Sequence, residues 1–125
     1  MTNQEILNTV VNHLWNQKVP AMHTTGCCYR TPDGLKCAIG CLITDVEYNP
    51  KMEHKNVENI TTKFHIKAIT NTSVTFLGDL QDLHDRIVAK TSWGLKVPQT
   101  MIAFKNQIKI ITQRWGLTFD VDSLV

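Results

Sequence analysis

Apolar residues recur at helical spacing near the start of the chain. Leu7, Val11 and Trp15 follow one another at four-residue intervals, and a second row one position earlier has the same period. The two rows predict an amphipathic helix with a broad apolar stripe. Thr2 followed by Glu5 is the capping-box pattern of a helix start, and Pro20 predicts the end. The apolar positions of this helix are Ile6, Leu7, Val10, Val11, Leu14 and Trp15.

Two later segments have the same period. Residues 73–90 place Asp82 and Arg86 at the spacing of an ion pair on one helix face. The apolar face of this segment holds Leu77, Leu80, His84, Ile87 and Val88, flanked by Phe76 and Leu83. A third helix is predicted to begin near Pro98, a good first-turn residue, and to end before Gly116. Its apolar positions are Met101, Phe104, Ile108, Ile111 and Trp115.

The region between the first two helices is less regular. The sequence "TPDG" at 31–34 predicts a tight turn, with residues 28–30 and 35–37 placed to pair as a short hairpin. Residues 37–43 form an apolar run that fits a strand or a helix, and its small residues favour a short helix. Across 61–69 apolar and polar residues alternate, which favours an amphipathic strand over a frayed helix.

These patterns predict the fold class. We expect an α+β, helix-dominated fold in which about three main amphipathic helices pack with a short hairpin or small sheet. With 125 residues, 42% of them hydrophobic, the chain is sized for one core, so a single globular domain over residues 1–125 is predicted.

Composition and charge limit the cellular compartments and the kinds of partner that we expect. No apolar run approaches the roughly 20 residues that span a bilayer, and the N-terminal residues do not resemble a signal peptide. We therefore predict a cytoplasmic protein with no membrane partner, whose four cysteines stay reduced. The formal net charge of +2 is too balanced for the basic patch of a nucleic-acid binder, so nucleic acid is disfavoured as a partner.

Two stretches together resemble a known group of proteins. They are "YRTPDGLKCAIGCLITDVEYNPKME" at 29–53 and "FLGDLQDLHD" at 76–85. The chain resembles small uncharacterised proteins of phages and prophage-bearing bacteria, which share a Tyr-Arg turn, a "KCAIG-LI-D--Y" block and a later "LQ-HD" helix. The resemblance implies a phage-type accessory protein in the host cytoplasm and transfers no catalytic residue. By analogy with other small phage proteins, it suggests counter-defence, through sequestering a signalling nucleotide or blocking a host protein.

The cysteines raise the alternative of a zinc site. Cys27 and Cys28 are adjacent, and Cys37 and Cys41 follow four residues apart. Structural zinc usually takes two close cysteine pairs on turns, and adjacent ligands rarely face one ion. We therefore expect no metal and no cofactor, with the cysteines acting as small apolar core residues.

A second alternative is a small metal-dependent or Cys/His-dependent hydrolase. Cys37 or Cys41 at a helix start would have a lowered thiol pKa, with His84 as the base and Asp85 or Asp45 orienting it. The adjacent His84 and Asp85 also resemble the metal-binding pair of phosphohydrolases. The competing interpretation of His84 is a buried histidine that is hydrogen-bonded to a carbonyl or carboxylate.

The turn at 31–34 suggests an anion site. Arg30 and Lys36 flank it, and a helix beginning near Cys37 would add its N–H groups. Tyr29, Tyr48 or Trp93 would stack a base, and the competing interpretation is a solvated turn. The predicted ligand-binding residues are Tyr29, Arg30, Asp33, Lys36, Asp45, Tyr48 and His84.

The leading hypothesis is therefore a binding protein and not an enzyme. Its partner would be an anionic small molecule or nucleotide, or a host protein, and a homo-oligomer is compatible with this. The hydrolase is the first alternative, and a zinc-stabilised nucleic-acid binder is the second. No Walker or Rossmann glycine pattern is present, which excludes ordinary NTPases and dehydrogenases.

Overall fold

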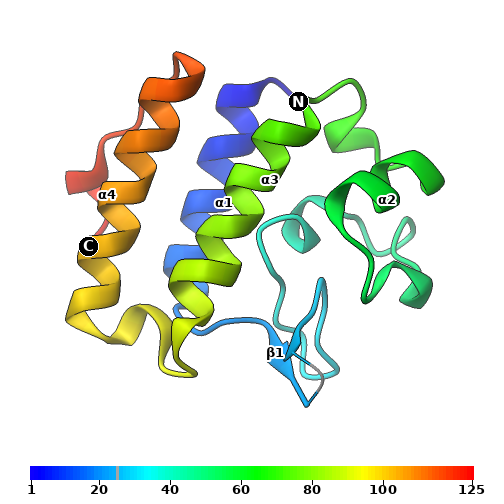
Figure 1. The fold of residues 1–125 in the computed structure, drawn as a ribbon, viewed down its shortest axis with the longest axis horizontal. Coiled ribbons are helices and arrows are strands. Elements are labelled where there is room, and N and C mark those ends of the chain that lie inside the picture. The colour runs from blue at the N-terminus through cyan, green and yellow to red at the C-terminus, as the bar shows by residue number, and fades with distance from the viewer. Residues whose placement is uncertain (25) are drawn as a thin grey trace.

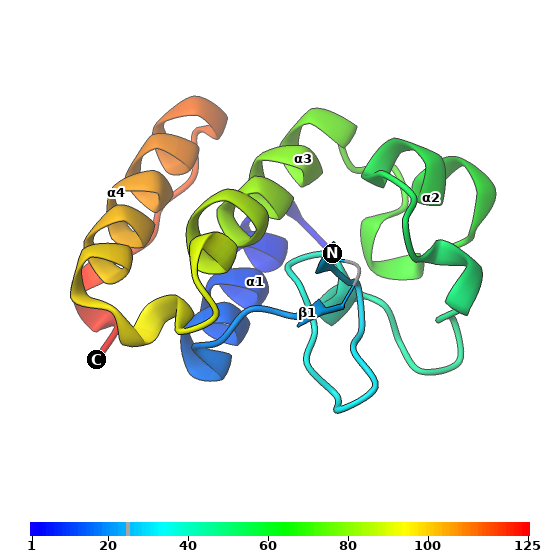
Figure 2. The same ribbon diagram turned by 60° about the horizontal axis from the view of Figure 1, so that its bottom comes forward.

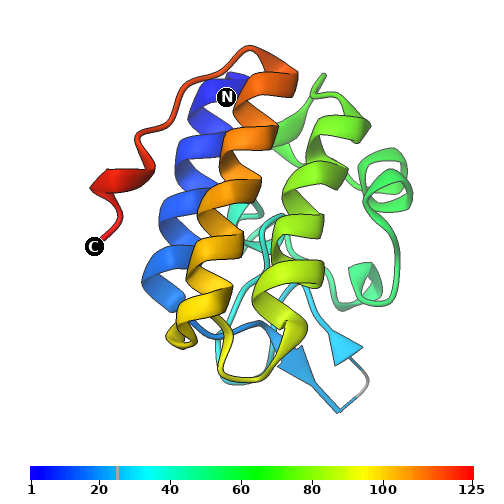
Figure 3. The ribbon, with the colours of Figure 1, turned by 60° about the vertical axis from the view of Figure 1, so that its left-hand side comes forward.

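The computed structural model describes residues 1–24 and 26–125, and its three main helices pack side by side (Figure 1). They are α1 (Asn3–Gln17), α3 (Val74–Asp82) and α4 (Pro98–Trp115). α4 contacts both neighbours through aromatic rings, with centroids 6.0 Å apart for Trp15 and Phe104 and 5.3 Å apart for Phe76 and Trp115. Figure 3 shows the same packing from the side of α4. The helix-dominated α+β fold predicted from the sequence is confirmed.

The ends of the helices follow the sequence patterns. The Glu5 N–H donates to Thr2 Oγ1 over 3.1 Å, and the Thr2 N–H donates to Glu5 Oε1 over 2.8 Å, so the capping box is complete. α4 begins at Pro98 as predicted. It ends at Trp115, before Gly116, which has a left-handed backbone with φ of 66° that a residue without Cβ adopts at little cost.

The predicted helix over residues 73–90 has three parts. α3 ends at Asp82, a π-helical turn covers Leu83–Ile87, and a 3-10 turn covers Val88–Lys90. A π-turn holds one residue more per hydrogen-bonded loop than an α-helix, and such turns are frequent at functional sites. His84 lies within this turn and is completely buried.

The small sheet differs from the predicted hairpin. β1 (Met22–His23) pairs with β2 (Gly26–Cys27) in antiparallel register, whereas the predicted pairing of 28–30 with 35–37 is reduced to one bridge between Arg30 and Lys36. The reason is that the Tyr29 N–H, which would pair with the Cys37 carbonyl in this register, donates to the carboxylate of Glu53. That amide is therefore not available to extend the ladder.

The strand favoured for residues 61–69 was wrong. α2 (Val57–Lys63) and a 3-10 turn at Lys67–Ile69 occupy this region. The Asn56 side chain caps α2 by accepting from the Asn59 N–H over 2.8 Å. The alternation reflects burial alone: Ile66 is buried on extended backbone between the exposed residues His65 and Lys67, and the structure describes no strand beside it.

Short helical turns connect the main elements. The apolar run at 37–43 contains a 3-10 turn, Gly40–Leu42, so the preference for helix over strand was right although the turn has only three residues. The other 3-10 turns are Pro50–Met52, Gly94–Lys96 and Val121–Ser123. Figure 2 shows α2 and the 37–55 connection on one side of α3 and α4 on the other. Among the described helices none has the length and apolar character needed to cross a membrane.

Candidate functional site

A pocket of about 360 Å³ is lined by α3 and the start of α2, and we call it the α3 pocket. Figure 2 shows α2 on the side of α3 that faces away from α4. Three segments far apart in the sequence form its walls: the end of β2 with the residues after it, the start of α2, and α3 with the π-turn. The lining residues are Cys27, Cys28, Tyr29, His54, Lys55, Asn56, Val57, Glu58, Val74, Gly78, Gln81, Asp82 and Asp85. The volume is in the range of small-molecule sites.

α3 lines the pocket with a single stripe of residues. Val74, Gly78 and Gln81 lie three or four positions apart and so share one face of α3, and Asp85 of the π-turn continues this row. Gly78 has no side chain, and a Cβ built on it would meet no described atom within 4 Å beyond the helix's own backbone. The space beside this glycine is part of the pocket.

Packing does not explain Gly78, although it explains other glycines of this chain. A Cβ at Gly40 would lie 1.9 Å from the carbonyl oxygen of Tyr29, so only glycine fits there. Glycine within a helix costs roughly 0.5–1 kcal/mol relative to alanine. α3 carries this cost at Gly78 with no packing contact that requires it, and the effect is an open pocket wall.

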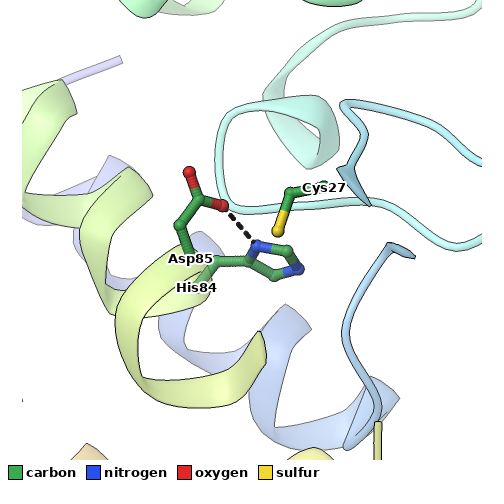
Figure 4. A group of neighbouring side chains, drawn as sticks. All are labelled: Cys27, His84 and Asp85. Atoms are coloured by element: carbon green, nitrogen blue, oxygen red, sulfur yellow. Dashed lines mark hydrogen bonds and ion pairs between the residues drawn. The ribbon is translucent and has the colours of Figure 1, made fainter. Parts of the chain in front are cut away.

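Asp85 forms the floor of the site within the π-turn, and the buried His84 beside it supports that floor (Figure 4). The Ala21 N–H donates to His84 Nε2 over 2.9 Å, and His84 Nδ1 lies 2.8 Å from Asp85 Oδ1. Because an N–H group can only donate, Nε2 carries the lone pair and the ring proton is on Nδ1, where it is donated to Asp85. Asp85 Oδ1 also accepts from the Gln81 amide over 3.1 Å. This is the buried, hydrogen-bonded histidine that was the competing interpretation of His84.

The same proton assignment counts against a metal at this cluster. Cys27, His84 and Asp85 place possible ligand atoms within 4.8 Å of one another. A metal would need the lone pair of His84 Nδ1, but that nitrogen holds the ring proton, and Nε2 is occupied by the Ala21 N–H. The alternative set of four cysteines is not assembled among the described residues, because Cys28, Cys37 and Cys41 lie outside this group.

The thiols do not have the properties of nucleophiles. Desolvation beside the pocket, followed by the charge of Asp85, raises the pKa of the exposed Cys27 thiol to about 11. Burial also raises the pKa of Cys37 to about 12 and that of Cys41 to about 12. Cys37 is completely buried, so a substrate cannot reach it. His84 cannot serve as the base that Cys/His catalysis needs, since both of its nitrogens are already engaged.

The residues predicted for an anion site have internal partners. Arg30 Nη1 donates to Asp45 Oδ1 over 2.8 Å, and Nη2 donates to the Ile43 carbonyl over 2.6 Å. The guanidinium also lies 4.7 Å from the ring centroid of Tyr48. Arg30, Asp45 and Tyr48 are therefore brought together, but as contacts that hold the 30–48 region.

The other predicted ligand-binding residues are dispersed. Asp33 accepts from the Thr31 hydroxyl within the turn. The backbone of Lys36 is held by Gln17 of α1, whose side chain bonds both its N–H and its carbonyl. The described segment directly after Cys37 contains only the three-residue turn Gly40–Leu42. The helix N-terminus that was expected at Cys37 is therefore not formed there. Of the predicted ligand-binding residues, Tyr29 lines the α3 pocket, and His84 supports its floor.

Glu53 is a structural residue that the sequence did not reveal. Its Oε1 accepts from the Tyr29 N–H over 2.9 Å, and its Oε2 accepts from the Arg30 N–H over 3.1 Å and the Tyr48 hydroxyl over 2.6 Å. The Tyr29 hydroxyl in turn donates to the Lys55 carbonyl over 2.6 Å. These bonds fix the wall of the α3 pocket that the segment after β2 provides.

Charge in the pocket is mainly negative. Glu58, Asp82 and Asp85 stand against Lys55, with His54 as a further titratable group. The sequence pointed to Asp85 but not to Gly78, Lys55 or Glu58, although a lone glycine within a helical pattern was a visible irregularity.

No known protein family, curated protein or solved structure matches the chain.

Proposed function

We propose that this protein acts by binding a small ligand in the α3 pocket. The observation that carries the proposal is Gly78, which lowers the stability of α3 without a packing reason and leaves the pocket open. Stability lost at a position where nothing in the fold requires it is typical of a functional site. The pocket combines a mainly apolar wall with a few polar groups, as small-molecule sites do.

Binding fits the chemistry of the site better than catalysis does. A hydrolase would need a free base or a bound metal, and His84 offers neither because its two nitrogens bond Ala21 and Asp85. A nucleophile would need a thiolate, and the raised pKa of Cys27 keeps its thiol protonated at neutral pH. These groups instead give a fixed, hydrogen-bonded floor, which suits recognition.

The biological setting is also part of the proposal. On the resemblance to phage-encoded proteins, the ligand would be a small molecule of the infected host, held in the host cytoplasm, and the effect would be counter-defence by sequestration. An anionic nucleotide stays a prediction that rests on the turn at 30–36. A host protein as partner is the other outcome. Native mass spectrometry of the protein recovered from infected cells separates them by the mass that is retained.

The pocket itself is tested with two variants at one position. Gly78→Ala should stabilise the fold by roughly 0.5–1 kcal/mol, because it removes a helical glycine and meets no neighbouring atom. Gly78→Leu places a larger side chain in the pocket. A chemically diverse fragment library, followed through the backbone amide signals of the wild type, should give hits that shift the pocket residues, and Gly78→Leu should abolish them.

Two results would contradict the proposal. One is a library in which no compound shifts the amide signals of the pocket residues. The other is a set of hits that bind Gly78→Leu as well as they bind the wild type while that variant keeps its fold.

A further inference from the structure

Asp85 is a carboxylate that the fold holds in one orientation at the pocket. Its Oδ1 receives two hydrogen bonds, from His84 Nδ1 over 2.8 Å and from the Gln81 amide over 3.1 Å. His84 is itself fixed, since it is completely buried and its other nitrogen accepts from the Ala21 N–H. The direction of the Asp85 side chain is therefore set by Gln81 of α3 and by His84 of the π-turn.

The second oxygen of Asp85 is left for another partner. Figure 4 shows it turned away from both His84 and Cys27, and within residues 1–24 and 26–125 no hydrogen bond reaches it. The side chain is 36% exposed, so a ligand can approach it. Oδ1 accepts from the Nδ1–H of His84 and from the side-chain amide of Gln81. Neither donor carries a positive charge that would neutralise the Asp85 carboxylate.

The surroundings reinforce this charge. Glu58 and Asp82 line the same pocket, against a single lysine, Lys55. Asp82 also lies 3.5 Å from Arg86, but both side chains are more than half exposed, so water screens this pair. These carboxylates would therefore repel an anion in the pocket, whereas a cation would reduce the repulsion among them.

From this geometry we infer that the α3 pocket selects an organic cation, a primary ammonium or guanidinium group carried on an apolar body. The inference rests on the proposed binding function and specifies its ligand class. The charged nitrogen donates to the free oxygen of Asp85 in a charge-assisted hydrogen bond. The apolar body lies against the mainly apolar wall, in the space beside Gly78 and Val74.

Three probes of similar shape separate charge from shape. Benzylamine is a cation at neutral pH, benzyl alcohol is neutral, and benzoate is an anion. Titrations followed through the amide signals of the pocket should give benzylamine an affinity about tenfold above that of benzyl alcohol, the worth of one charge-assisted hydrogen bond. Benzoate should bind most weakly of the three.

Matched variants assign the selectivity to Asp85. Asp85→Asn keeps an oxygen for His84 and Gln81 but removes the charge, so benzylamine should bind about tenfold more weakly and benzyl alcohol as before. Glu58→Gln, an exposed change outside the hydrogen-bonded floor, should weaken benzylamine about threefold. Asp122→Asn removes an equal charge from the C-terminal turn Val121–Ser123, which does not line the pocket, and should change neither affinity.

The outcomes separate this inference from the proposed function. Equal affinities of the three probes, all abolished by Gly78→Leu, would overturn the cation preference and leave the binding pocket standing. Tighter binding of benzoate, or a benzylamine affinity that Asp85→Asn and Glu58→Gln leave unchanged, would overturn it as well. If neither the probes nor the fragment library shift the pocket signals, both the inference and the proposed function are refuted.

Discussion

Replacing His84 tests the hydrogen-bonded floor most directly. His84 joins the π-turn to the chain that leaves α1, because its Nε2 accepts from the Ala21 N–H over 2.9 Å. Both His84 and Ala21 are completely buried. His84→Leu fills a similar volume but offers no acceptor, so it isolates the hydrogen bond. His84→Ala removes the acceptor and also leaves a cavity.

The expected magnitudes follow from these two effects. A buried N–H group left without a partner costs about 1–3 kcal/mol, which is the expected loss for His84→Leu. The Asp85 side of the network adds little, because that carboxylate is partly exposed and water can replace the lost donor. His84→Ala adds the cost of a cavity, so its total loss should be roughly 3–6 kcal/mol. Such a loss is a large part of the stability of a small domain.

The measurement is urea denaturation followed by circular dichroism, with amide hydrogen exchange at Ala21 as a second readout. Both variants should be destabilised in the stated order, and the Ala21 amide should lose protection before the centre of α1 does. A His84→Leu variant within about 0.5 kcal/mol of the wild type would refute the argument, since it lies below the lower bound for an orphaned buried N–H.

Three further changes have defined outcomes. At pH 8, iodoacetamide should alkylate Cys27 about a hundredfold more slowly than free cysteine, because its pKa of about 11 keeps the thiol protonated. Asp85→Asn should speed the reaction, since it removes a charge that raises this pKa. A rate equal to that of free cysteine would contradict this prediction. Hydrogen bonds from the Lys67 and Thr44 N–H groups lower the pKa of Glu47, so its stabilising effect is present above the unfolded pKa and is lost as pH falls through the folded value. The melting temperature of Glu47→Gln should therefore depend less on pH below about 4.5 than that of the wild type, and parallel curves would refute this. Gly116→Ala should destabilise the fold by about 1 kcal/mol in thermal unfolding, opposite in sign to Gly78→Ala, because Gly116 has a φ of 66°.

Local patterns in the sequence were sufficient to predict α1 and α4. The capping box of Thr2 and Glu5, Pro98 at a first turn and Gly116 past a last turn act on backbone groups within a few residues. The periodic apolar rows then predict which face of each helix is buried. Their effects are local, so neighbouring residues were enough to predict them.

The middle of the chain depends on contacts between distant residues. Glu53 takes the N–H group of Tyr29, and this competition shortens the predicted hairpin to one bridge. The alternation at 61–69 has the period of a strand, but Asn56 caps a helix before it, and none of the described residues forms a strand beside Ile66. A period of two records which side chains are buried, and it cannot report whether a second strand is present.

The candidate site also has a part that the sequence predicted and a part that only the tertiary structure decided. The sequence identified His84 and Asp85 as a chemically notable pair, and a buried histidine bonded to a carboxylate was one of the interpretations it left open. The choice between ligand, base and structural support came from Ala21, 63 positions away, whose N–H occupies Nε2 and places the ring proton on Nδ1. In the sequence, Gly78 is only an irregular residue in a helical pattern. In the structure, α2 and the segment after β2 enclose the space beside it and make it part of a pocket. Helix ends are determined by residues close in the chain, whereas proton positions and pocket walls depend on groups that folding alone brings together.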